Sequence, residues 1–147
     1  MKPKICTLKP LQNYKMLNFL AQIRMTGKAW VNNVRVAMID WGRVRELRDE
    51  IGTEDFAEVV QLFLEETDEV AEKIRSAMPE RDIESALHFL KGSALNLGFR
   101  ELASMCQVGE KSAAMGQFET IDLNQVIAIY EKSKSAFDIG QKAESAA

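Results

Sequence analysis

The chain has 147 residues, of which 46% are hydrophobic and 28% charged, so we expect one ordinary globular domain. No apolar run approaches the roughly 20 residues that a membrane-spanning helix needs, so we expect no membrane segment. Its net charge of −3 is uneven: residues 38–147 carry all 22 acidic side chains and 12 of the 19 basic ones, a balance of −10 that argues against nucleic-acid binding. Its two cysteines, Cys6 and Cys106, are too far apart in sequence to suggest a disulfide framework or a metal cluster, which favours a reducing cytoplasm.

The first 37 residues differ from the rest of the chain. They hold the other seven Lys and Arg and no Asp or Glu. Two prolines and Gly27 interrupt them, although the apolar spacing between Leu11 and Ile23 would suit a short amphipathic helix. We interpret residues 1–37 as a basic N-terminal arm, either a flexible leader or an interaction arm, in front of one domain at 38–147.

Two helices are predicted at the start of the acidic body. Asp40 can cap a short helix that Gly52 ends. Thr53 can cap a long helix that reaches about Met78, with acidic residues in its first turn where the helix dipole favours negative charge. The predicted buried faces are Trp41, Val44 and Leu47 on the short helix, and Phe56, Val60, Phe63, Thr67, Val70 and Ile74 on the long one.

Three more helices follow. Pro79 suits the first turn of one that Gly98 stops, the next runs from about Phe99 to Met115, and Thr120 or Asp122 starts the last. Their predicted buried faces are Ile83, Leu87, Leu90, Ala94 and Leu97; then Leu102, Cys106, Gly109 and Ala113; then Leu123, Val126, Ile127, Tyr130 and Phe137.

These patterns predict an all-α fold. Four amphipathic helices joined by short turns favour an antiparallel up-and-down four-helix bundle, with the short helix as an addition in front. No segment of the acidic body shows the alternation of a strand. The tail after Ile139 is rich in Ala, Ser and Glu, and we expect it to fray. Because such a bundle closes its own core, we expect a monomer.

His88, the only histidine, is the main candidate for chemistry. It lies about 100° around the helix axis from the buried stripe, so it should reach solvent, and Lys91, Gly92 and Leu95 share its face. A glycine inside a helix lowers the stability of the helix by about 1 kcal/mol relative to alanine. We therefore expect that another surface approaches the backbone closely at Gly92, beside His88. Imidazole is a competent nucleophile toward phosphorus. Lys91 could offer charge to phosphoryl oxygens, and Ser93 a hydroxyl at the edge of the patch.

The stretch from His88 to Gly98, HFLKGSALNLG, resembles the signature of the histidine-containing phosphotransfer (HPt) domains of bacterial and eukaryotic phosphorelays. The similarity extends over about Met38 to Asp138, and we identify the chain as a stand-alone HPt protein of bacterial type. The resemblance implies that His88 takes a phosphoryl group at Nε2 from the aspartyl phosphate of a receiver domain and delivers it to another receiver. It also implies that Lys91 steadies the phosphoryl oxygens and that Gly92 admits the receiver's loops.

Several further expectations follow from the resemblance. The partners would be response-regulator receiver domains and hybrid sensor kinases, and the receiver would bring magnesium, so the chain would need no cofactor of its own. Where the family often has a polar residue, commonly Gln, against the histidine, this chain has Glu110, and Gln107 is a weaker candidate. Leu95 would belong to a docking rim. Phe99 could belong to the rim or to the core.

Four alternative functions fit the sequence less well. The chain lacks a P-loop and a kinase signature, so we expect a phosphocarrier and not an ATP-dependent enzyme. A non-catalytic helical module that binds receiver domains would not require the His88 nucleophile. The dimerisation hairpin of a sensor kinase usually has an acidic residue and then a proline after its histidine, whereas Phe89 follows here without a proline. The hypothesis of a metal site formed by His88 and Cys106 is weak, because two ligands rarely suffice to hold a metal ion.

Overall fold

The computed structural model describes residues 38–146, whose regular structure is helical apart from one isolated bridge between Ile39 and Phe99. The all-α prediction is confirmed. The predicted basic arm, residues 1–37, lies outside the described residues, so its boundary with the domain stays a prediction. The helices are α2 (Trp41–Ile51), α3 (Thr53–Arg75), α4 (Glu80–Leu97), α5 (Arg100–Ala114) and α6 (Leu123–Ala146), with a short 3-10 turn, η3 (Phe118–Thr120), before α6.

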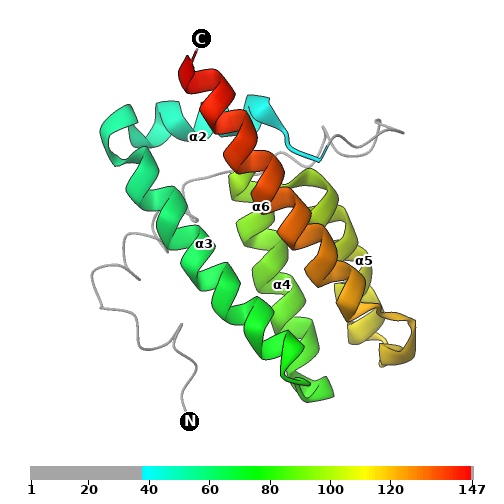
Figure 1. Cartoon of the computed structure of the whole chain (residues 1–147). Helices are drawn as coiled ribbons and strands as arrows, with labels where there is room; N and C mark the ends of the chain where they lie inside the picture. Colours follow the sequence, from blue (N-terminus) through cyan, green and yellow to red (C-terminus); the bar gives the residue numbers. More distant parts are fainter. Residues whose placement is uncertain (1–37, 147) are drawn as a thin grey trace. The chain divides into compact units, whose positions relative to one another are not determined.

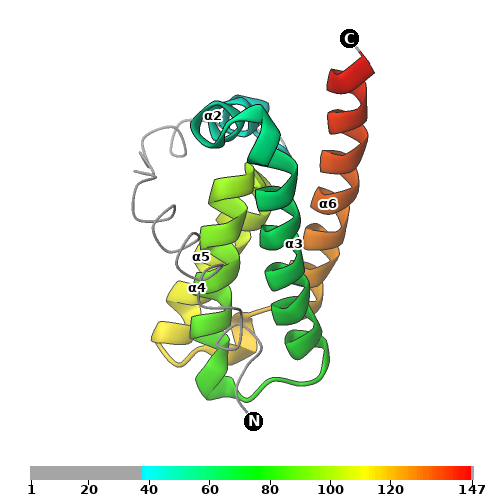
Figure 2. The same cartoon turned by 90° about the vertical axis from the view of Figure 1, so that its left-hand side faces the viewer.

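The four long helices, α3 to α6, lie side by side, and each runs opposite to the one before it (Figure 1 and Figure 2). Helix α4 packs against α3 and α5, and α6 packs against α5 and α3, so the four enclose a shared core. Helix α2 lies across the end where α3 begins and α4 ends. Within the described range, no helix is both long enough and apolar enough to cross a membrane.

One glycine separates α2 from α3. Asp40 caps α2 as predicted, because its Oδ1 accepts a hydrogen bond from the backbone N–H of Arg43 at 3.1 Å. The prediction that Thr53 caps α3 is wrong, since Thr53 is already the first helical residue. Gly52, with φ +95°, serves both helices: its N–H donates to Arg48 and its carbonyl accepts from Phe56. No separate capping residue is therefore needed.

Helix α3 is shorter than predicted. It ends at Arg75 and not near Met78. Ala77 has a left-handed φ of 61°, and Pro79 precedes the first helical residue of α4 where we expected it inside the first turn. The ring of Pro79 disfavours helical geometry at Met78, so α3 could not continue through that residue.

Helix α6 is longer than predicted. Of the two candidate starts, Asp122 caps it, accepting from the N–H of Gln125 at 3.0 Å. The expectation that the tail frays after Ile139 is wrong, since the helix continues to Ala146. Two contacts with α2 hold this end: the ring of Phe137 stacks on Trp41 at 5.9 Å, and Glu144 pairs with two arginines of α2.

The predicted buried faces of α2 to α5 form the core, with only Trp41 partly exposed. On α6 the prediction is partly wrong. Leu123 and Ile127 are only partly buried, whereas Ile129 and Ser133 are buried. Ser133 can occupy a core position because its hydroxyl donates to the carbonyl of Ile129 at 2.7 Å.

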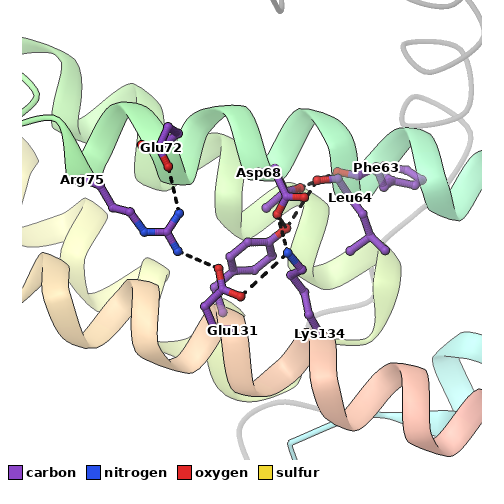
Figure 3. A network of polar contacts seen from close by, with 9 residues as sticks. Phe63, Leu64, Asp68, Glu72, Arg75, Glu131 and Lys134 are labelled. Carbon is purple, nitrogen blue, oxygen red and sulfur yellow. Dashed lines mark hydrogen bonds and ion pairs between the residues drawn. The ribbon is translucent and has the colours of Figure 1, made fainter.

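Polar contacts join α6 to α3 (Figure 3). The hydroxyl of the fully buried Tyr130 donates to Asp68 at 2.6 Å, and Lys134 pairs with the same carboxylate at 2.7 Å. About two turns further along α3, Arg75 pairs with Glu131 at 2.6 Å. These contacts satisfy the polar end of a buried aromatic ring, which would otherwise cost free energy on folding.

Hydrogen bonds from the segment before α2 hold the turn between α4 and α5 in place. Gly98 adopts the left-handed conformation that ends α4, as predicted, and its carbonyl accepts from the N–H of Asp40 at 2.7 Å. The Arg100 N–H donates to the carbonyl of Met38 at 3.1 Å, and its guanidinium pairs with Asp40 at 2.8 Å. The segment before α2 is thus bonded to the turn that sets α4 against α5.

Candidate functional site

His88 projects from the outer side of α4. Its side chain is 70% exposed, whereas the neighbouring Leu87 and Leu90 have no exposed surface. This contrast follows from the 100° step between consecutive helical residues. The imidazole is therefore accessible to a partner while its helix is fixed by the core.

Glu110 of α5 contacts the imidazole. Its Oε1 lies 2.7 Å from Nδ1 of His88, and its Oε2 pairs with Nζ of Lys91 at 2.5 Å. The structure thus brings together three of the predicted site residues from two adjacent helices. An ionised carboxylate only accepts hydrogen bonds, so Nδ1 must be the donor. The neutral imidazole consequently carries its proton on Nδ1 and keeps a lone pair on Nε2.

Glu110 is suited to this role because it stays ionised. Burial raises the pKa of its carboxyl, but hydrogen bonds and charge from Lys91 and His88 outweigh burial, and the net pKa lies below the usual value. The side chain is only 19% exposed, which limits its motion. The site is therefore a fixed anion between an imidazole and an ammonium group.

Gly92 and Leu95 lie on the same side of α4 as His88, and both are partly exposed. Among residues 38–146, a Cβ atom added at Gly92 would meet no atom within 4 Å outside the adjacent backbone of its own helix. The backbone beside His88 is thus open to another molecule.

Three other candidates lie elsewhere. Ser93 is only 4% exposed, so our expectation that its hydroxyl borders the exposed patch is wrong: five residues after His88, it has turned toward the core. Gln107 is exposed on α5 and makes no hydrogen bond to His88. Phe99 is 1% exposed and belongs to the core, which decides between its two proposed locations.

Cys106 lies in the core, whereas His88 lies on the exposed face of α4. Cys106 is fully buried, and burial, followed by the charge of Glu110, raises the pKa of its thiol to about 12. A protonated thiol is a poor ligand, because metals bind the thiolate. Within residues 38–146, no group of three or more His, Cys, Asp or Glu side chains is placed to hold a metal ion.

The Hpt domain family model matches residues 58–135, slightly more than half of the chain, and the matched region includes His88, Lys91 and Glu110. No curated protein and no solved structure matches the chain significantly. The match begins in α3 and ends in α6, so it includes the helices that carry the site and most of the core behind it. The chain therefore belongs to the Hpt domain family.

Proposed function

We propose that this protein is a phosphocarrier of a two-component phosphorelay, in which His88 accepts a phosphoryl group from the aspartyl phosphate of one receiver domain and passes it to another. Membership in the Hpt domain family implies a general role in histidine phosphotransfer within phosphorelays. The observation that carries the assignment to His88 is its exposed imidazole, whose Nδ1 lies 2.7 Å from the carboxylate of Glu110.

The geometry supports a direct transfer at Nε2. The lone pair on Nε2 forms a bond to phosphorus while the bond from phosphorus to the aspartyl oxygen breaks, and the leaving carboxylate keeps that electron pair. Because Nδ1 keeps its proton, the phosphorylated ring carries a positive charge next to Glu110. In the second transfer, the aspartate of the next receiver forms the new bond and the ring leaves with its lone pair on Nε2.

Lys91 and the receiver would supply the positive charge that this transfer needs. Lys91 already lies next to the imidazole through its ion pair with Glu110, within one helical turn of His88. Phosphoryl transfer depends mainly on positioning and on neutralising the charge of the oxygens. We propose that the receiver brings a magnesium ion for the same purpose and that this chain contributes no cofactor.

Gly92 supports a docking site beside His88. A helical glycine costs about 1 kcal/mol relative to alanine. At Gly140 the packing of α6 accounts for this cost, because a Cβ atom there would overlap the ring of Trp41. At Gly92 a Cβ atom would meet nothing among the described residues outside its own helix. We propose that the receiver's loops approach this backbone and that Leu95 borders the contact.

We further infer that α3 to α6 form the antiparallel up-and-down four-helix bundle of the family, with α2 as the additional helix. The opposite directions of successive helices support this inference (Figure 1). The partners would be receiver domains of response regulators and of hybrid sensor kinases, the exchange would take place in the cytoplasm, and the carrier would act as a monomer. The net charge of −10 over residues 38–147 argues against a nucleic-acid partner.

The test is phosphoryl transfer from a purified receiver that has been phosphorylated with a radiolabelled small phosphodonor. The full chain should acquire a label that is stable in base and labile in acid, which is typical of phosphohistidine. His88→Gln should acquire none while keeping its helicity by circular dichroism, and Lys111→Gln, an exposed change on α5, serves as the control. Labelling of His88→Gln would contradict the proposal. A receiver that binds the chain but never labels it would favour a non-catalytic interaction module.

A further inference from the structure

We infer that Gly109 is a positioning residue for phosphotransfer: its missing side chain lets α5 approach α4 closely enough for Glu110 to hold the imidazole of His88. The predicted effect of Gly109 on the rate of phosphoryl transfer rests on the proposed function. Its predicted effect on the tautomer of His88 can be measured in the chain alone, without a receiver domain.

A side chain at position 109 would collide with α4. An added Cβ atom would lie 2.9 Å from Cδ1 of Leu87 and 3.6 Å from Cγ2 of Ile121. A carbon–carbon separation of 2.9 Å is well inside the optimum of about 3.5–4.0 Å. Leu87 has no exposed surface, so it cannot move into solvent without disturbing the core. Either Leu87 or the whole of α5 would have to shift.

This contact lies directly beside the hydrogen bond that depends on it. On α4, Leu87 immediately precedes His88, and on α5, Gly109 immediately precedes Glu110. The spacing set where Gly109 meets Leu87 is therefore the spacing that Glu110 must bridge. The distance of 2.7 Å from Oε1 to Nδ1 is already at the short end of charge-assisted hydrogen bonds. A separation of the two helices would lengthen it toward the range in which such bonds weaken.

Helix propensity does not account for glycine at this position. Alanine is the better residue in a helix interior, and its methyl group would add apolar burial. For Gly109→Ala these gains oppose the collision with Leu87, so the net change in stability should be small. A displacement of α5 would act on the bond between Glu110 and His88 in one direction only, because a wider spacing weakens it.

The experiment measures the tautomer of the single histidine in the full chain. In long-range nitrogen–proton NMR spectra of the neutral imidazole, the wild-type protein should show a protonated Nδ1 and an unprotonated Nε2. In Gly109→Ala the two nitrogen shifts should move toward each other as the tautomers mix, and transfer from a receiver should slow roughly fivefold, the factor expected for one weakened hydrogen bond. Lys111→Gln, the exposed change on α5, should leave both shifts unchanged.

Two further variants test the route of the effect. Leu87→Val removes both atoms of Leu87 that the new Cβ would meet, so it should restore the wild-type shifts in the Gly109→Ala background. In a Glu110→Ala background, Gly109→Ala should slow transfer no further, because the residue through which it acts is absent. Wild-type shifts in Gly109→Ala would overturn the inference. Altered shifts in a chain that no receiver labels would uphold it and contradict the proposed function instead.

Discussion

Glu110 determines which nitrogen of His88 is free to react. A glutamine at this position could turn either its oxygen or its nitrogen toward the ring, whereas a carboxylate can only accept. The bond at 2.7 Å therefore selects the tautomer with its lone pair on Nε2. The second oxygen holds Lys91 next to the same ring. One side chain thus sets both the orientation of the nucleophile and the position of the nearest cation.

Substitutions at Glu110 separate these two effects. Glu110→Ala should slow transfer about tenfold, because a charge-assisted hydrogen bond to a largely exposed ring is lost. Glu110→Gln should retain most of the rate, since its amide oxygen can still accept from Nδ1. The measurement is single-turnover transfer from a phosphorylated receiver. Glu84→Gln, an exposed carboxylate one turn before His88, is the control. Equal losses in Glu110→Ala and Glu110→Gln would show that the carboxylate's charge, and not its hydrogen bond, is required.

At the scale of the helices, two glycines that look alike in the sequence have different surroundings. Gly140 lies in α6 where the ring of Trp41 fills the place of a side chain, and Gly92 lies in α4 beside open space. The first glycine allows α2 to dock on α6 through the stack of Trp41 on Phe137. The second has no packing role in the described residues. Packing among residues 38–146 therefore explains Gly140 but not Gly92.

This difference predicts opposite changes in stability. Gly140→Ala should lower the free energy of unfolding by about 1–2 kcal/mol, because overlap with Trp41 outweighs the gain in helix propensity. Gly92→Ala should raise it by up to about 1 kcal/mol, since only the propensity changes. Urea denaturation followed by circular dichroism measures both values. A stabilised Gly140→Ala variant would mean that α2 does not pack on α6 as described.

For the molecule as a whole, the sequence was sufficient to predict the helices and most of the core. Helical periodicity is a local property, so the buried faces could be read from spacing alone. Helix ends were less predictable, because a single residue can serve two helices, as Gly52 does where Thr53 was expected. The resemblance to a family indicated Glu110, but the spacing of 22 residues from His88 could not show that they touch.

The contact between Gly109 and Leu87 was beyond sequence reasoning for the same reason. Spacing placed both residues on buried faces, but only the packing of α4 against α5 brings them together.

The burial of Glu66 was not predicted, for a different reason. Glu66 was not among the predicted buried residues of α3, yet it lies at the edge of the apolar face and is only 4% exposed. A residue at the edge of an apolar stripe can be covered by the neighbouring helix, which spacing does not reveal.

The burial of Glu66 should make the stability of the whole protein depend on pH. Burial, and secondarily the charge of Glu69, raises the pKa of this carboxyl from 4.5 to about 7. Within residues 38–146 it has no hydrogen-bond or ion-pair partner. The folded state therefore binds this proton more tightly than the unfolded state does. Stability is greatest below the unfolded pKa and falls as the pH rises through the folded pKa.

Ionisation of Glu110 changes the free energy of unfolding with pH in the opposite direction to Glu66, and it does so in another pH range. Because its pKa is lowered by folding, its contribution is complete above the usual carboxyl pKa and is lost only as the pH falls below it. Between pH 5 and 8 Glu110 thus contributes almost no slope. Glu110 therefore does not account for a decline in stability over this interval.

We therefore predict that the free energy of unfolding falls by about 2–3 kcal/mol between roughly pH 5 and 8, because about two units of the pKa difference are titrated there. Glu66→Gln should remove most of this decline and be more stable than the wild type at the alkaline end, since it carries no charge to bury. Urea denaturation across the interval measures the slope, with Glu58→Gln, an exposed carboxylate of the same helix, as the control. An unchanged slope in Glu66→Gln would mean that another group titrates on unfolding.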